Sequence, residues 1–209
     1  MLTRQQIKEI SREQIGKNTG MTIGGFLISI FVPIAAAAIG FGIGGYIVQS
    51  VMQIGYAAFC ISIFVGKQTT AGDIFNKGFD KNFGRKLGGM LFKDLFIFLW
   101  SLLLIIPGII KSYSYFMVPY ILANDEDIKA TQATRMSIIM MKGHKWQTFV
   151  MYLSFLGWNI LTAITAGIVG YLYAGRYQAT ALAGLAMEIR EEAIRNNIVK
   201  IDETGHLAF

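Results

Sequence analysis

Two cations stand inside apolar stretches of this sequence, and their position gives them the clearest potential for chemistry. Lys111 lies within residues 102–123, and Arg176 lies nine residues after Gly167 in the last apolar stretch. A charged group at the centre of a membrane helix costs about 2.5–3.5 kcal/mol on insertion scales, so such residues often mark functional sites. Lys111 and Arg176 are therefore candidate sites for an anionic solute or a lipid phosphate.

Each cation also has a purely structural interpretation. Lys111 follows Pro107 closely, where its long side chain can reach the outer headgroups. Arg176 would lie about 13 Å into its helix, near mid-membrane, if Gly167 is at the surface. No acidic residue in the apolar stretches can pair with Arg176, so backbone carbonyls, tyrosine hydroxyls or water would have to satisfy it.

The other reactive side chains lack a catalytic arrangement. Residues 112–115 are rich in hydroxyls but have no neighbouring general base. The single cysteine, Cys60, and the two histidines have no zinc-ligand spacing. We therefore expect a protein that is not an enzyme and that holds no metal or cofactor. Polar side chains within the apolar stretches are expected to form hydrogen bonds between helices: Gln49, Gln53, Asn159 and Gln178.

The composition predicts an integral membrane protein. Hydrophobic residues make up 54% of the 209-residue chain and charged residues 15%, compared with about 25% charged residues in soluble domains. Residues 21–66 and 146–175 contain no charge, and about 20 apolar residues suffice to cross a bilayer. We predict an all-α, polytopic transmembrane helical bundle of about six spans, with amphipathic cytoplasmic helices.

Glycine and proline predict where these helices turn. Pro107 and Gly108 form a corner in the central apolar stretch, and Pro119 is a second break. Gly167 is the corner before the last span, and the glycine-rich residues 40–45 form the first hairpin. The predicted spans are two within 21–66, then 87–106, 108–123, 146–167 and 168–189. A single kinked span over residues 90–123 is the alternative to two separate helices.

Charge predicts the orientation of the spans. If six spans form three hairpins, 17 of the 19 lysines and arginines fall on one side of the membrane, as the positive-inside rule requires. We expect the net charge of +6 to reflect this topology rather than nucleic-acid binding. The prediction is a multi-pass plasma-membrane protein with both termini cytoplasmic. Its parts are a helix over 1–20, a membrane domain over 21–189 and a charged tail over 190–209.

The polar segments are predicted to lie at the membrane surface. Residues 1–20 form an amphipathic helix, with Thr3 and Gln6 as a capping box and an isoleucine stripe on one face; a solvated leader is the alternative. Residues 67–94 mix aromatic residues with lysines, which favours contact with anionic headgroups over RNA binding. Residues 124–145 predict an interfacial helix that is capped by Asn124 or Asp125, carries acids at 125–127 and ends at Gly143.

A family resemblance rests on four segments. Trp100 with the stretch 102–123, MMKGHKW (140–146), LSFLGW (153–158) and TAGI (165–168) together resemble the bacterial membrane proteins grouped as domain of unknown function 975, over roughly residues 55–190. This family occurs mainly in Gram-positive bacteria, and the resemblance implies membrane location and a helical fold but no reaction. The sequence is more distantly similar to the membrane domain of some glycerophosphodiester phosphodiesterases. Arg176 stands where the family typically has proline.

We expect a non-enzymatic membrane protein that interacts with lipid or with a partner. The expected partners are the lipid bilayer, especially anionic headgroups, and either another membrane protein or a second copy of the chain. No nucleic acid is expected. The alternative is a small transporter or permeation unit for an anionic solute or lipid, with Lys111 and Arg176 attracting the anion. An intramembrane enzyme is a third interpretation, which the missing catalytic groups disfavour.

Overall fold

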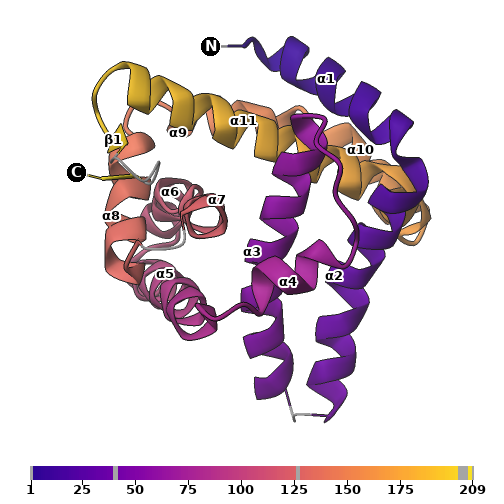
Figure 1. Ribbon diagram of the computed structural model, residues 1–209, viewed down its shortest axis with the longest axis horizontal. Coiled ribbons are helices and arrows are strands. Elements are labelled where there is room, and N and C mark those ends of the chain that lie inside the picture. Colours follow the sequence, from indigo (N-terminus) through magenta and orange to yellow (C-terminus); the bar gives the residue numbers. More distant parts are fainter. Residues whose placement is uncertain (1, 40–41, 126–127, 202–206, 209) are drawn as a thin grey trace.

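The computed structural model describes residues 2–39, 42–125, 128–201 and 207–208, and this part of the chain is almost entirely helical (Figure 1). This confirms the all-α class. The helices are α1 (Arg4–Lys17), α2 (Thr19–Ile39), α3 (Ile43–Phe64), α4 (Asp73–Gly78), α5 (Phe83–Leu103), α6 (Ile105–Ser114), α7 (Val118–Asn124), α8 (Ala130–Met140), α9 (Lys145–Leu153), α10 (Leu156–Ile164), the π-helical η1 (Gly170–Ala174) and α11 (Gly175–Arg195). Two short strands, β1 (Lys200–Ile201) and β2 (Leu207–Ala208), pair antiparallel near the C-terminus.

Three of the described helical segments are long and apolar enough to cross a membrane: Thr19–Ile39, Gly44–Phe64 and Lys145–Ile164. They correspond to the first, second and fifth of the predicted spans. The third falls on α5, which carries several charged residues, and the fourth is divided between the short helices α6 and α7. The sixth falls on η1 and α11, whose C-terminal half is rich in acids and arginines. Figure 1 shows α2 and α3 running down the page while α5 and α6 are seen nearly end-on.

The first hairpin joins α2 and α3 within the predicted glycine-rich stretch, of which Gly40 and Phe41 lie outside the described residues. The two helices approach closely at Gly45, where a Cβ would lie 2.7 Å from the Cα of Ala37. Glycine therefore permits the tight backbone contact that closes this hairpin.

Helix α1 has the predicted cap, but its apolar stripe does not face the membrane. The hydroxyl of Thr3 accepts from the backbone N–H of Gln6, and the Gln6 side chain accepts from the N–H of Thr3. Ile7 and Ile15 are fully buried in the protein core, where α1 contacts α11 and α3. The prediction of a lipid-facing stripe is therefore wrong, because other helices of the protein cover that face.

The central corner lies three residues earlier than predicted. Leu104 adopts an extended conformation (φ −158°, ψ 137°) and separates α5 from α6. Pro107 is the third residue of α6, where its missing N–H has no intrahelical partner to lose. A Cβ on Gly108 would lie 2.8 Å from the Cα of Ser101, so α6 folds back onto α5. This hairpin excludes one long kinked span over residues 90–123.

The polar connection after α3 packs α4 against that helix. Ile74 of α4 is fully buried, and a Cβ on Gly55 of α3 would collide with the carbonyl oxygen of Ile74. Gly78 approaches the carbonyl of Val51 in the same way. Figure 1 shows α4 crossing beside the middle of α3. Ile74 and Gly78 thus pack on protein, whereas Phe75 and Phe79 of the same segment are exposed, and headgroup contact stays a prediction.

Helix α8 also differs from its prediction. Helix α7 continues to Asn124, and α8 begins only at Ala130, so neither Asn124 nor Asp125 caps it. Glu126 and Asp127 lie outside the described residues. Met136 and Met140 are buried in the core, and the Ser137 hydroxyl donates to the carbonyl of Ser114 (2.8 Å). The helix ends at Met140, three residues before the predicted Gly143, and Gly143 lies in the following turn with a φ of +87°.

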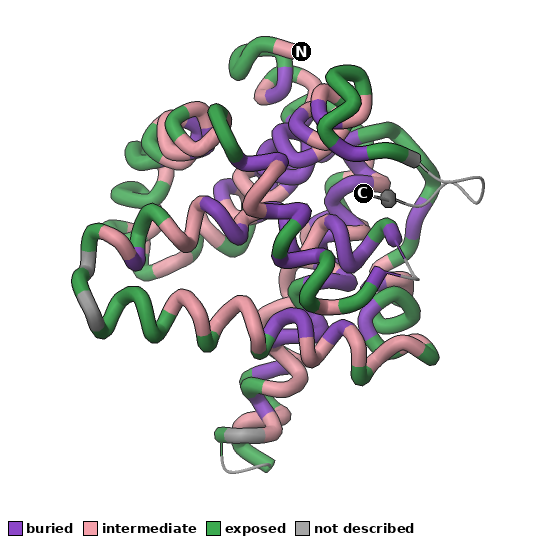
Figure 2. Tube along the Cα trace, turned by 90° about the vertical axis from the view of Figure 1, so that its left-hand side faces the viewer, coloured by how far each residue is buried: buried purple, intermediate pink, exposed green. Residues whose placement is uncertain are grey.

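The last hairpin turns at Gly167 as predicted. Ala166 and Gly167 have positive φ values of 49° and 92°, and η1 and α11 follow. The inner part of α11 is buried continuously over residues 180–186. Figure 2 shows buried residues concentrated in the middle of the molecule and exposed residues along the protruding hairpins. Those exposed residues are largely apolar, as a lipid-facing surface would be.

Candidate functional site

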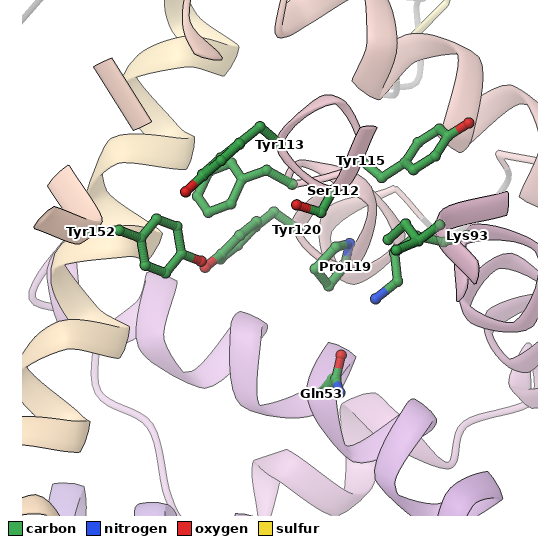
Figure 3. Close-up of a pocket in the computed structure, with 10 residues that line it drawn as sticks. Gln53, Lys93, Ser112, Tyr113, Tyr115, Pro119, Tyr120 and Tyr152 are labelled. Atoms are coloured by element: carbon green, nitrogen blue, oxygen red, sulfur yellow. The ribbon is translucent and has the colours of Figure 1, made fainter. Parts of the chain in front are cut away.

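The main candidate site is a cavity of about 460 Å³ between α3, α5, α6, α7 and α9. Its lining residues are Gln53, Lys93, Ile97, Ser112, Tyr113, Tyr115, Phe116, Pro119, Tyr120 and Tyr152. We call it the tyrosine cavity. Figure 3 shows Lys93 on one side, Tyr120 and Tyr152 on the opposite side, and Gln53 across from Pro119.

Lys93 is the only charged residue among the described residues that line the tyrosine cavity. Its ammonium lies 3.2 Å from the carboxylate of the neighbouring Asp94. The other oxygen of Asp94 accepts a hydrogen bond from the hydroxyl of Tyr46 (2.9 Å), which links α5 to the first hairpin. The ammonium of Lys93 is therefore paired with Asp94 at the edge of the cavity.

Aromatic rings make one wall of the tyrosine cavity rigid. The ring of Tyr113 meets those of Phe149 and Tyr152 edge to face, with centroids 6.1 Å apart in each pair. Phe116 packs on Tyr120 at 5.3 Å and on Tyr152 at 6.3 Å. Edge-to-face pairs at these distances are favourable, so the hydroxyls are presented from a fixed scaffold.

Tyr113 also separates the tyrosine cavity from an apolar groove of about 360 Å³. The groove is lined by Ile109, Ile110, Tyr113, Lys145, Trp146 and Phe149. A polar cavity and an apolar groove thus share one side chain. Such a pair matches an amphiphile, which needs polar partners at one end and apolar surface along the other.

A second polar feature runs along α3. Tyr46, Gln49, Gln53 and Tyr56 recur at helical spacing on one face of this helix. Gln53 lines both the tyrosine cavity and a second cavity of about 290 Å³ between α2 and α3. Gln49 and Tyr56 line that second cavity too. The two spaces therefore meet at a side chain that can donate and accept hydrogen bonds.

Lys111 lies outside the tyrosine cavity. Its ammonium sits 4.7 Å from the centroid of the Trp100 ring across the α5–α6 corner, which is a cation–π distance. Gly108 allows this corner to close against Ser101. Pro107 lies in the first turn of α6, and the structure thus brings Lys111, Pro107 and Gly108 together at the end of the α5–α6 hairpin.

Arg176 is held elsewhere and is 6% exposed. It donates to the carbonyl of Leu172 (2.8 Å), the hydroxyl of Thr22 (2.7 Å) and the carbonyl of Thr19 (3.4 Å). Among the residues that the structure describes, no carboxylate contacts it. Thr19 and Thr22 form the first turn of α2, so Arg176 lies near the end of that candidate span rather than near its middle.

The two remaining predicted positions, Pro119 and Gly167, have structural roles at the ends of helices. Pro119 is the second residue of α7 and lines the tyrosine cavity. Gly167 forms the turn after α10, where a side chain would meet the ring of Tyr171. Of the six predicted positions, only Pro119 therefore borders the tyrosine cavity.

The sequence contained some signals for the residues that line this cavity. Tyr113 and Tyr120 are seven residues apart, as on one helix face. The sequence predicts helix–helix hydrogen bonding for Gln53 and places Lys93 in the polar connection, so neither residue's local pattern predicts a shared cavity. Tyr152 lies in an uncharged stretch, and no local pattern distinguishes it.

Comparison with known proteins gives one family. Neither the curated proteins nor the solved structures contain a match to this chain, so the similarity to phosphodiesterase membrane domains stays a prediction. The family model described as "Protein of unknown function (DUF975)" matches residues 90–192. The matched region holds Lys93, Lys111, Tyr152 and Arg176. Over residues 90–192 the chain thus matches the DUF975 family of proteins of unknown function.

Proposed function

We propose that this protein is a non-enzymatic, multi-pass plasma-membrane protein that binds the headgroup of an anionic lipid in the tyrosine cavity. The observation that carries the proposal is the pairing of this cavity with the apolar groove across Tyr113. Lys93 would face the lipid phosphate, and the hydroxyls of Tyr120 and Tyr152 would donate to its oxygens. Ammonium and hydroxyl donors are common partners of phosphate groups.

An acyl chain would follow the groove beside the tyrosine cavity. Ile109 and Ile110 are about half exposed, and Trp146 is 72% exposed, so the groove is open on its outer side. In a bilayer this surface would face hydrocarbon. Lys145 at the groove would stay within reach of the headgroup level, because a lysine stem can extend along apolar surface.

The proposed orientation places both termini in the cytoplasm. Its support is the distribution of lysines and arginines around the six predicted spans. The three apolar helices support membrane insertion itself and not the sides of the termini. A Gram-positive source follows only from the family resemblance. The orientation is testable with single cysteines at exposed positions and a membrane-impermeant thiol reagent.

Native mass spectrometry of the protein, released gently from membranes, tests lipid binding. We expect phosphatidylglycerol to remain bound to the wild type, and Lys93→Gln to weaken its retention roughly tenfold, equivalent to about 1.4 kcal/mol. Lys81→Gln removes the same charge from an exposed position and should retain the lipid. Tyr152→Phe and Tyr171→Phe form a second matched pair, inside and outside the cavity.

Two results would contradict the proposal. Equal lipid retention by Lys93→Gln and Lys81→Gln would remove the role of the cavity. A stoichiometric protein that co-purifies without any lipid dependence would instead make the chain a subunit of a complex, either with another membrane protein or with a second copy of itself.

The second candidate function is permeation of an anionic solute. The polar row of α3, which joins the two cavities at Gln53, favours it. Flux of a small anion into liposomes that contain the purified protein would support this function, and Gln53→Leu should abolish that flux. Lipid retention without flux would leave the lipid-binding proposal alone.

A further inference from the structure

The cations of α1 gather on an aromatic cluster formed by α9–α11 and do not meet acids there. The ammonium of Lys8 lies 4.5 Å from the centroid of the Phe155 ring and 6.0 Å from that of Tyr177. The guanidinium carbon of Arg12 lies 5.8 Å from the Tyr177 centroid. Lys8 also donates to the carbonyl and the hydroxyl of Ser154, both at 3.3 Å.

A third cation approaches the same aromatic cluster. The guanidinium of Arg176 lies 5.7 Å from the Tyr173 ring, and the rings of Tyr173 and Tyr177 are 5.5 Å apart. Within the described residues, none of the ion pairs with a carboxylate involves Lys8, Arg12 or Arg176. Three positive charges are thus collected around neutral acceptors and aromatic faces.

The hydroxyl of Tyr177 gives an independent indication of a ligand. Tyr177 is fully buried, and its hydroxyl oxygen makes no hydrogen bond of normal geometry within the described chain. The Arg12 guanidinium lies within hydrogen-bonding reach of this hydroxyl, but it can only donate. The proton of the buried hydroxyl therefore still needs an acceptor, and an anion bound beside Arg12 would supply one.

The charge of Lys8 points in the same direction. Burial is the largest influence on its ammonium, followed by repulsion from Arg4 and Arg12, and together they lower the pKa of Lys8 from its usual value. A bound anion would offset that repulsion.

We propose that Lys8, Arg12 and Tyr177 form a second binding site, distinct from the tyrosine cavity, for a phosphate-class anion where α1 crosses the α9–α10 turn and α11. Two cationic donors and a hydroxyl donor match the three acceptor oxygens of a phosphate group. The phosphate is either that of a lipid headgroup or a free anion.

The surface beside this site favours a lipid source. Leu153, Leu156 and Ile160 are each about half exposed and recur at helical spacing next to Ser154 and Phe155. A lipid whose phosphate contacts Lys8 could lay its chains along these residues. Bound lipid would thereby join α1 to α10, which lie far apart in the sequence.

The test measures phosphatidylglycerol binding in nanodiscs of phosphatidylcholine, with the full-length protein. We expect Lys8→Gln/Arg12→Gln to lower the number of phosphatidylglycerol molecules retained per protein, with affinity falling roughly tenfold or more, about 1.4 kcal/mol. Lys17→Gln/Lys142→Gln removes two charges from exposed positions, one of them on the same helix, and should bind like the wild type. Lys93→Gln should leave this site intact, which separates it from the tyrosine cavity.

Tyr177→Phe tests the buried hydroxyl without changing shape or charge. We expect it to weaken binding while Lys8→Arg, which keeps the cation, preserves most of it. These two variants remain informative if the double variant folds poorly.

Inorganic phosphate distinguishes the sources of the anion. If phosphate raises the thermal unfolding temperature of the wild type but not of Lys8→Gln/Arg12→Gln, the site takes a free anion. If only phosphatidylglycerol binds in a Lys8- and Arg12-dependent manner, the site takes a lipid. Equal binding of both ligands by the double variant and its matched control would overturn the proposal.

Discussion

The ammonium of Lys86 lies 2.5 Å from a carboxylate oxygen of Asp80, and only 1% of the Lys86 side chain is exposed. Lys86 also donates to the carbonyl of Lys77, and the second oxygen of Asp80 accepts from the N–H of Asn82 (2.9 Å). These contacts tie the end of α4 to the start of α5. They fix the path of the chain between these two helices.

Removing one partner of this buried pair should be costly. We expect Lys86→Met to lower the free energy of unfolding by about 3 kcal/mol, because Asp80 would keep its charge without its cation. Thermal unfolding in a mild detergent measures the change. Lys81→Met is the matched control at an exposed position, and similar stability of the two variants would contradict this account.

The stability of the α3–α4 connection should depend on acid pH. The N–H of Thr70 and the hydroxyl of Thr69 donate to Asp73, and these bonds lower the pKa of Asp73. The stabilisation is therefore complete above the unfolded-state pKa, about 3.9, and is lost as the pH falls through the lower folded-state value. Unfolding temperatures of Asp73→Asn should fall less between neutral and acid pH than those of the wild type. If the unfolding temperatures of the variant and the wild type fell equally, Asp73 would not contribute to the acid sensitivity of the protein.

Two glycine-to-alanine changes should have opposite effects. Gly55→Ala places a methyl group against the backbone of Ile74, and overpacking of this kind costs about 1–3 kcal/mol. Gly24→Ala on α2 meets nothing within 4 Å and should stabilise its helix by about 0.5–1 kcal/mol. The unfolding temperature should be highest for Gly24→Ala, intermediate for the wild type and lowest for Gly55→Ala. A stable Gly55→Ala protein would mean that α4 does not pack on α3.

Arg176 and Thr22 should be energetically coupled. Their hydrogen bond (2.7 Å) is charge-assisted, and such a bond contributes about 1.5–3 kcal/mol. We expect Arg176→Gln and Thr22→Val each to destabilise the protein, with a double variant less affected than the sum. A thermodynamic cycle measures the coupling. Additive effects, together with lost ligand retention in Arg176→Gln alone, would instead favour a functional role for this arginine.

Local sequence determined several features of this protein. The long uncharged stretches gave the helical class and three candidate spans, since their length and apolarity match a bilayer. The Thr3–Gln6 cap and the turn at Gly167 were also predictable, because they depend on residues close together in the chain. Pro107 indicated the central corner but not its residue, because proline is tolerated in the first turn of a helix and the break falls before it.

Only the tertiary structure decided what covers each apolar face. The isoleucines of α1 and the methionines of α8 have the spacing of a lipid-facing stripe, yet both stripes pack on protein. Periodicity cannot distinguish these outcomes, because lipid and protein interiors are both apolar. The Lys86–Asp80 pair, the Arg176–Thr22 bond and the tyrosine cavity likewise depend on how the helices meet. Lys93, Gln53 and Tyr152 come from three different helices, and their shared cavity exists only where α3, α5 and α9 are brought together.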